Sequence, residues 1–240
     1  MRFDDCVIVI TGVGRKGQVG EAVAQAFAGR GAALVLVERS EQRARERAGE
    51  LGAGAARAVA LGADLADPSA AHEMAASLSA TIGPRIDALV HLAGGFAMSG
   101  PVADSAPDDW ERMLAINLRT AVNTTRVLLP ALRKARGAIV YFASEAVLPG
   151  SRTAEMGAYA AAKSGVVALM RAVALEERAH GVRANALAPG TIRTAENVAS
   201  MGPDARFVER DAVADAVIWL CGTGARGVTG QVIQLSAGPG

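Results

Sequence analysis

The sequence predicts an α/β protein built on a doubly wound sheet of seven mostly parallel strands, with helices on both faces. Short apolar runs rich in β-branched residues recur along the chain, and helical periodicity marks the segments between them. Successive positions within the runs are apolar, which is typical of strands that helices cover on both sides. This alternation of strand and helix favours a parallel sheet. The expected strands are Cys6–Thr11, Ala33–Val37, Arg57–Leu61, Ala88–Leu92, Ala138–Ala143, Arg183–Leu187 and Gln231–Leu235.

Six helices are expected between these strands. Two have start signals: Asp67 precedes Pro68, and Ser105 has Asp108 three residues later. No internal repeat, charge block or linker divides the chain, so residues 1–240 are expected to form a single domain. The expected helices are Gly20–Arg30, Ser40–Leu51, Pro68–Thr81, Pro107–Arg133, Gly157–His180 and Asp211–Cys221.

The composition argues against several classes of partner. The formal net charge of +1 gives no electrostatic reason to expect nucleic acid or an anionic membrane surface. No apolar run approaches the ~18 residues of a membrane span. Cys6 and Cys221 lack metal-ligand spacing, and the three histidines form no ligand cluster. We therefore expect a soluble cytoplasmic protein without a metal.

A glycine-rich turn follows the first expected strand and precedes the first helix. Glycines at this place allow a tight turn and let phosphates approach backbone N–H groups at the helix N-terminus. The position matches the dinucleotide-binding fingerprint, which makes the turn a strong signal. The expected cofactor contacts in this turn are Thr11, Gly12, Gly14, Arg15, Lys16, Gly17 and Val19.

The residues at the ends of strands two and three bear on which dinucleotide binds. Glu38 lies about 20 residues past the turn, where an acid binds the adenosine ribose hydroxyls of NAD and repels the 2′-phosphate of NADP. Arg39, Arg15 and Lys16 are cations that could hold such a phosphate, so NADP stays an alternative to the favoured NAD. Asp64 follows strand three on the ligand side of the sheet, although helix capping would also explain it.

Tyr159 and Lys163 form the candidate acid/base pair. The spacing of four residues within an expected helix places both side chains on one face, about one turn apart. A lysine ammonium beside a phenol favours the phenolate, so we expect Lys163 to lower the pKa of Tyr159.

With these motifs in order, the chain resembles the short-chain dehydrogenase/reductase family almost from end to end. The resemblance implies a Rossmann-type fold and assigns further residues. Asp64-Leu65 resembles the pair that contacts adenine, and Leu89 to Gly94 resembles the strand-four motif, which includes Ala93 and Gly94. Pro189-Gly190 through Thr194, with Ile192 between them, resembles the turn that holds the nicotinamide carboxamide.

The resemblance also implies the division of catalytic roles. Tyr159 is expected to be the general acid in reduction and the general base in oxidation. Lys163 would hold the nicotinamide ribose, Ser144 would hydrogen-bond the substrate oxygen, and Asn117 would position a water for proton exchange with Lys163.

Some residues depart from the family pattern. The glycine turn is about two residues longer than usual, with Gln18 in place of the middle glycine, which resembles the enoyl-reductase branch. That branch has a tyrosine seven residues before the lysine, where this chain has Met156. The catalytic helix therefore favours a carbonyl/alcohol enzyme. His91 replaces an asparagine and is expected to be a core residue.

Two segments near the expected pocket also differ in length. Ser144 precedes Tyr159 by fifteen residues rather than thirteen, and Glu145 beside it is interpreted as a solvated loop carboxylate rather than a second acid. The segment 194–210 is shorter than the family's usual lid, which predicts a more open pocket. Phe96 and Val147 are expected near Ser144 and Thr194 around that pocket.

The sequence thus predicts an NAD(P)-dependent oxidoreductase that interconverts a secondary alcohol and a ketone. Two alternatives stay open: an NADPH-dependent 3-oxoacyl-carrier-protein reductase, whose acyl substrate is carrier-bound, and a non-catalytic dinucleotide sensor or scaffold. The long alanine-rich helices predict a symmetric homo-oligomer, a dimer or a tetramer.

Overall fold

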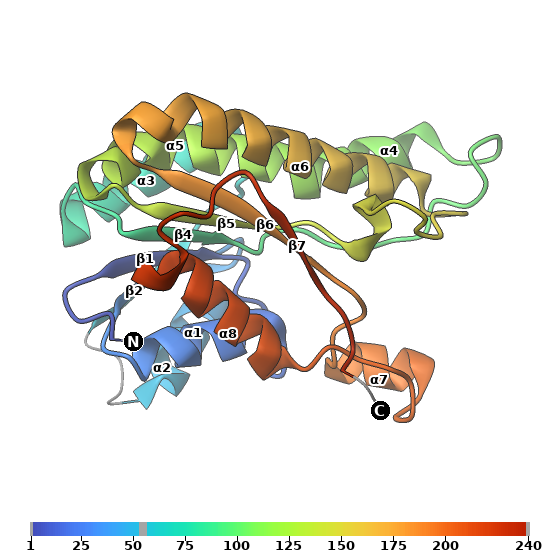
Figure 1. The fold of residues 1–240 in the computed structure, drawn as a ribbon, viewed down its shortest axis with the longest axis horizontal. Helices are drawn as coiled ribbons and strands as arrows, with labels where there is room; N and C mark the ends of the chain where they lie inside the picture. The colour runs from blue at the N-terminus through green and yellow to red at the C-terminus, as the bar shows by residue number, and fades with distance from the viewer. Residues whose placement is uncertain (1, 53–56, 239–240) are drawn as a thin grey trace.

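The computed structural model describes residues 2–52 and 57–238, which form three layers: a central sheet between two layers of helices (Figure 1). The sheet has seven strands in the order β3-β2-β1-β4-β5-β6-β7, and all six neighbouring pairs are parallel. The strands are β1 Val7–Thr11, β2 Ala33–Glu38, β3 Arg57–Gly62, β4 Ala88–His91, β5 Ala138–Phe142, β6 Arg183–Pro189 and β7 Val232–Leu235. The predicted fold class is confirmed, with strand ends shifted by one or two residues.

Helices cover both faces because alternate strand residues point to opposite sides. Ile8 and Ile10 of β1 pack under α1 (Val19–Ala28) and α8 (Arg210–Cys221). Val9, between them, belongs to the core on the other face, beneath α3 (Pro68–Ile82) and α6 (Gly157–Glu176). Both cores are mainly aliphatic, and their central side chains are closed to solvent. Figure 1 shows α1, α2 (Glu41–Glu50) and α8 on one side of the sheet, and α3, α5 and α6 on the other.

The predicted helix Pro107–Arg133 is present but interrupted. It consists of α4 (Pro107–Met113), a π-helical turn over Leu114–Arg119, and α5 (Thr120–Ala135). Pro107 occupies the first helical turn after Ala106, so Ser105 is not the capping residue that the start signal indicated. Asp67 does cap α3, accepting from the Ser69 amide at 2.8 Å. A π-turn widens the helix by one residue and often marks a functional position.

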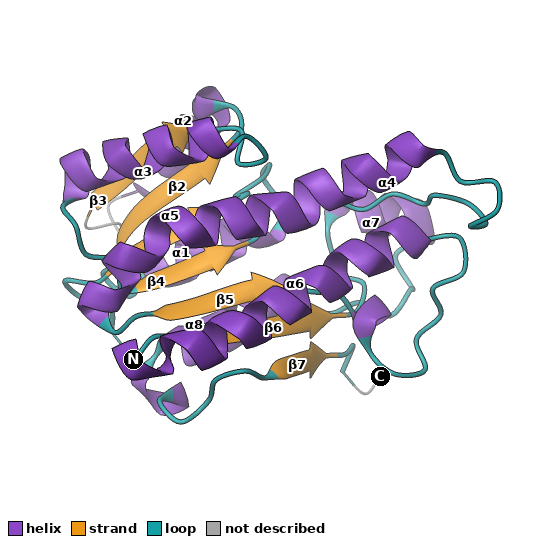
Figure 2. Ribbon diagram, turned by 90° about the horizontal axis from the view of Figure 1, so that it is seen from above, coloured by secondary structure: helices purple, strands orange, loops and turns teal. Residues whose placement is uncertain are grey.

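The segment predicted as a lid holds a helix that the sequence analysis missed. α7 (Ala195–Met201) begins at Thr194, whose hydroxyl caps it by accepting from the Asn197 amide at 3.2 Å. Asn197 also donates to the carbonyl of Ile192 at 2.7 Å. In Figure 2, α7 lies beyond the carboxyl ends of β4, β5 and β6. These hydrogen bonds fix the first turn of α7 to the segment that precedes it.

One helical segment, Gly157–His180, is long and apolar enough to cross a membrane by length and composition alone. It comprises α6 and a 3₁₀ turn, Glu177–His180. Val166 and Met170 on its inner face are fully covered by the sheet. The segment is therefore a core helix of the α/β domain.

Candidate active site

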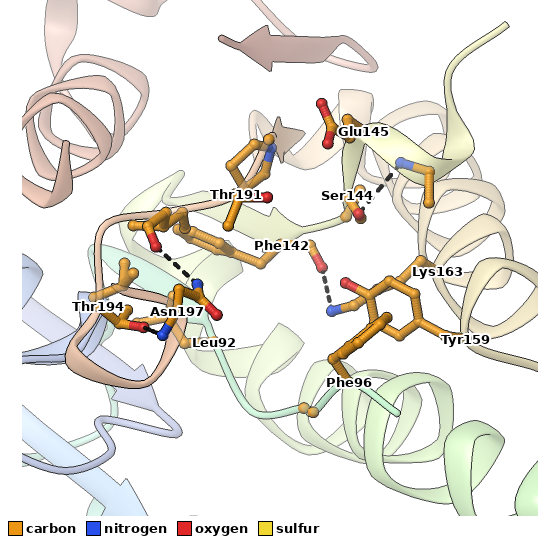
Figure 3. Close-up of a pocket in the computed structure, with 18 of the residues that line it drawn as sticks. Leu92, Phe96, Phe142, Ser144, Glu145, Tyr159, Lys163, Thr191, Thr194 and Asn197 are labelled. Carbon is orange, nitrogen blue, oxygen red and sulfur yellow. Dashed lines mark hydrogen bonds between the residues drawn. The ribbon is translucent and has the colours of Figure 1, made fainter. Parts of the chain in front are cut away.

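A cavity of about 850 Å³ opens at the carboxyl ends of the strands. It runs from the glycine turn to the acid/base pair (Figure 3). This is where ligands bind in open parallel sheets. The predicted site residues that line it are Gly12, Val19, Gly94, Ser144, Tyr159, Lys163, Pro189, Gly190, Ile192 and Thr194.

Other predicted residues lie outside the cavity wall. The remaining cofactor-binding candidates are Thr11, Gly14, Arg15, Lys16, Gly17, Glu38, Arg39, Asp64, Leu65 and Ala93. Asn117 lies behind the wall beside Gly95. Phe96 lines the cavity as expected, whereas Val147 does not.

The glycine turn is shaped to let other backbone approach closely. Gly12 has a φ of +69°, and a Cβ there would lie 2.5 Å from the backbone of Ala93. Helix α1 starts at Val19 and directs its N-terminal amides toward the same end of the cavity. An anionic dinucleotide fits this combination of close backbone and helix N-terminus.

Glu38 lies where the fingerprint places it, beside the glycine turn. Its Oε1 accepts from the Gly14 amide at 2.6 Å, and its Oε2 accepts from the Arg39 amide at 3.2 Å. The carboxylate is thereby fixed at the end of β2. On the neighbouring strand, Asp64 accepts from the Ala66 amide at 3.0 Å and so shapes its own turn.

Lys163 is buried inside the domain, where its ammonium donates a hydrogen bond to the backbone. Its Nζ donates to the Phe142 carbonyl at 2.8 Å, and the side chain is 6 % exposed. Burial lowers the pKa of Lys163 to about 8, because the ammonium has lost its water shell. The Nζ lies 5.9 Å from the centre of the Tyr159 ring.

The pKa of Tyr159 is raised rather than lowered. Burial has the largest effect, the hydrogen bond with Ser144 opposes it, and the charge of Glu145 adds to it. The expectation that Lys163 lowers this pKa is not met, because the Lys163 ammonium is directed to the Phe142 carbonyl. Phe96 packs edge-to-face on the Tyr159 ring, with centroids 5.0 Å apart, and fixes its orientation.

The π-turn presents Asn117 to the loop after β4. Its Nδ2 donates to the carbonyls of Gly95 at 3.0 Å and Met113 at 3.1 Å, and its Oδ1 accepts from the Gly95 amide at 3.2 Å. Asn117 thus holds the Gly94–Gly95 segment against Lys163. Its predicted role in proton exchange stays a prediction.

His91 is a core residue, as predicted. Its Nδ1 lies 2.9 Å from the Thr11 hydroxyl and its Nε2 lies 3.4 Å from the Thr120 hydroxyl. Burial, followed by the nearby charge of Lys163, lowers its pKa to about 3. A neutral His91 therefore links Thr11 at the end of β1 to Thr120 at the start of α5.

Several wall residues were not singled out as site residues from the sequence. They belong to the lid and to the strand ends, and only the fold brings them to the cavity. These are Leu92, Phe142, Thr191, Asn197, Ser200 and Met201. The family motifs do not assign these positions to the site, because the sequences of connecting segments vary among related proteins.

Comparison with known proteins decides the family. A family profile described as "Enoyl-(Acyl carrier protein) reductase" matches residues 12–239. The chain is 37% identical over 194 residues to meso-2,3-butanediol dehydrogenase of Serratia marcescens, covering 81% of this chain and 74% of that one. The protein belongs to the short-chain dehydrogenase/reductase family.

Two further relatives of this short-chain dehydrogenase/reductase cover nearly its whole length. D-threitol dehydrogenase of Mycolicibacterium smegmatis is 30% identical, with 99% of this chain and 94% of the relative covered. The structure of a 3-oxoacyl-[acyl-carrier protein] reductase with bound NAD from Brucella melitensis is 32% identical, covers 98% and 91% of the two chains, and has a TM-score of 0.84. The short-chain dehydrogenase/reductase described here is accordingly an oxidoreductase of the class that acts on CH–OH groups.

Proposed function

We propose that the protein interconverts a secondary alcohol and a ketone with a nicotinamide cofactor, and that NAD is preferred over NADP. The observation that carries the proposal is the shared cavity: Ser144, Tyr159 and Lys163 line its reacting end, and the glycine turn lines the other. When bound, the nicotinamide supplies the hydride chemistry.

The chain's own residues would handle the proton and the developing charge. Tyr159 donates its phenolic proton to the carbonyl oxygen in reduction and accepts the alcohol proton in oxidation. Ser144 donates a hydrogen bond to the same oxygen and stabilises the charge that forms there. Lys163, freed from the Phe142 carbonyl, would hold the cofactor ribose and stabilise the phenolate. The turn from Pro189 through Thr194 would hold the carboxamide.

The spacing of the acid/base pair argues against enoyl reduction. The tyrosine of the enoyl branch would stand at position 156, where Met156 lines the cavity without a proton to transfer. A carbonyl needs its proton delivered to oxygen, which Tyr159 and Ser144 together can do. The match to the family profile described as an enoyl reductase therefore supports membership of the family. It does not support an enoyl substrate.

The decisive experiment follows the absorbance of the reduced nicotinamide with a panel of secondary alcohols and ketones, including 3-oxoacyl thioesters. Turnover should vanish in Tyr159→Phe, which removes only the hydroxyl, and should persist in Tyr141→Phe, which removes a buried hydroxyl bonded to Thr125. Tight cofactor binding without turnover of any panel member would favour the sensor alternative. Preference for the thioesters would favour the acyl-carrier alternative.

The cofactor preference rests on Glu38, whose carboxylate lies at the end of β2. Titrations with NADH and NADPH should show tighter NADH binding. In Glu38→Gln the difference should shrink, because the charge that repels a 2′-phosphate is gone and Arg39 stays. Tighter NADPH binding by the unaltered protein would contradict this assignment.

We also propose that the protein is a cytoplasmic homo-oligomer. The exposed side of α6 carries Leu175, which is 69 % exposed, so an apolar side chain there is available to a second copy. Sedimentation should give a dimer or a tetramer, and a monomer at micromolar concentration would contradict it.

A further inference from the structure

Glu145 is a carboxylate in the wall of the catalytic cavity to which the proposed reaction assigns no role. It directly follows Ser144 and opens the 3₁₀ turn Glu145–Val147 at the end of β5. Figure 3 shows it beside Ser144, at the end of the cavity that also holds Tyr159. The expectation of a solvated loop carboxylate is therefore only half met: the side chain is exposed, but it is exposed to the cavity.

The carboxylate lies across the gap between the ends of β5 and β6. A Cβ on Gly190 would lie 3.0 Å from Glu145 Oε2, which is tighter than ordinary van der Waals contact. A side chain at position 190 would therefore push the carboxylate away. The absence of one leaves the carboxylate room beside the reacting end.

Other acidic side chains of this region have hydrogen-bond partners on the protein. Glu38 accepts from the Gly14 amide, Glu21 accepts from the Gly17 amide at 2.6 Å, and Glu196 accepts from the Gln18 amide group at 3.0 Å. Among the residues that the structure describes, none donates a hydrogen bond to the Glu145 carboxylate or forms an ion pair with it. Its charge does reach Tyr159, whose pKa it helps to raise.

The position of the reacting oxygen limits what can lie against Glu145. In the proposed reaction that oxygen is bound by Ser144 and Tyr159. Glu145 directly follows Ser144 in the wall of the same cavity, so a substituent on the next substrate carbon can be directed toward residue 145. An apolar group there would remove water from the carboxylate without replacing its hydrogen bonds, which costs free energy. An acidic group would be repelled. A hydrogen-bond donor would be stabilised by a charge-assisted bond.

We propose that Glu145 is a specificity-determining residue that selects substrates with a hydrogen-bond donor on the carbon next to the carbinol carbon, that is, vicinal diols and the matching hydroxyketones. This inference rests on the proposed alcohol–ketone reaction and adds the substrate class to it. Glu145 accepts the hydrogen bond of the neighbouring hydroxyl, while Ser144 and Tyr159 hold the reacting one.

The test compares two alcohols that differ by one hydroxyl, 2,3-butanediol and 2-butanol, with NAD as oxidant. The unaltered protein should have the higher kcat/KM for the diol. In Glu145→Ala that preference should fall by about 10- to 100-fold, the range that one hydrogen bond to a charged group supports. Glu145→Asp should restore part of it. A shift in the pKa of Tyr159 affects the oxidation of both alcohols, so it cancels in the ratio of the two kcat/KM values.

Two controls separate the carboxylate from general effects. Glu73→Gln alters an exposed carboxylate of α3, remote from the cavity, and should leave the preference unchanged. In the Glu145→Ala protein, 1-amino-2-propanol should lose as much kcat/KM as the diol, because its ammonium is also a donor. An unchanged ratio of diol to 2-butanol in Glu145→Ala would overturn the assignment.

Ligand-observed NMR of 2,3-butanediol with the NAD complex gives a measure that does not require turnover. Weaker diol binding by Glu145→Ala than by the unaltered protein would support the subsite even if no alcohol were oxidised, and would then count against the proposed reaction alone. Equal diol binding by both proteins would overturn the subsite whatever the turnover.

Discussion

Gln18 of the glycine turn donates hydrogen bonds of 3.1 and 3.0 Å to the two carboxylate oxygens of Glu196 on α7. The two residues are 178 positions apart in sequence. Gln18 stands where the family pattern has a glycine, and the Gln18 Oε1 also accepts from the Arg15 amide at 3.3 Å. The Gln18 side chain of this turn therefore connects α7 by hydrogen bonds to the end of the cavity where the cofactor is expected. These hydrogen bonds connect α7 to the glycine turn.

Removing the hydrogen bonds between Gln18 and Glu196 should increase local opening of α7. In Glu196→Ala the amides of residues 195–201 should exchange with solvent about 3- to 10-fold faster, since these hydrogen bonds are exposed and worth no more than about 1 kcal/mol. Hydrogen–deuterium exchange measured by mass spectrometry checks this. Asp204→Asn alters another exposed lid carboxylate and should leave the exchange unchanged; equal acceleration in both variants would show that the Gln18 contact does not hold the lid.

The buried ammonium of Lys163 should make stability depend on pH. Its pKa is about 8 in the folded protein against 10.5 ordinarily, so the unfolded chain binds more protons between pH 8 and 10.5. Stability relative to Lys163→Met should therefore rise with pH across that window and be flat below pH 8, with a total change of up to about 3 kcal/mol.

Urea denaturation of both proteins at pH 7, 8, 9 and 10 measures this difference. Both proteins carry the same other titratable groups, so the difference between their stabilities isolates the titration of Lys163. Methionine is chosen because its side chain is similar in length to that of lysine. A difference that does not change with pH would mean that Lys163 has its ordinary pKa in the folded state.

The buried His91 should make the stability of the fold depend on pH in the acidic range. Its pKa is about 3 when folded against 6.5 ordinarily, so the unfolded chain takes up the proton first. Stability is fully present above pH 6.5 and falls as the pH drops toward 3, by up to about 1.4 kcal/mol per pH unit. His91→Asn should lose this contribution, which thermal unfolding at pH 7, 6 and 5 can detect. Parallel pH curves for the two proteins would contradict a neutral, buried His91.

Glu145 should also set the pH at which alcohol oxidation begins. Its charge raises the pKa of Tyr159, so Glu145→Gln should lower that pKa and move the rising limb of kcat/KM toward lower pH. A pH–rate profile with 2-butanol, which lacks the second hydroxyl, isolates the effect from substrate recognition. A limb at the same or a higher pH would show that Tyr159 does not sense this carboxylate.

The motif residues of the site could be predicted from the sequence because each is tied to one element. Ser144 follows the end of β5, and Tyr159 and Lys163 lie one turn apart on α6, so a correct strand and helix assignment brings them to one sheet edge. The lid helix could not be predicted in this way. α7 has seven residues, which is too short to show a periodic pattern.

The sequence alone determined the layered fold, because period and run length decide which segments are buried strands and which are amphipathic helices. It also predicted that Ser144, Tyr159 and Lys163 lie together, and the structure places all three in the wall of one cavity. Only the tertiary structure decided how charges act across elements: that Lys163 turns to Phe142, that Gln18 reaches Glu196, and that the Glu145 carboxylate lies beside Gly190. Those outcomes depend on distances between segments far apart in the chain, and no local pattern of residues encodes them.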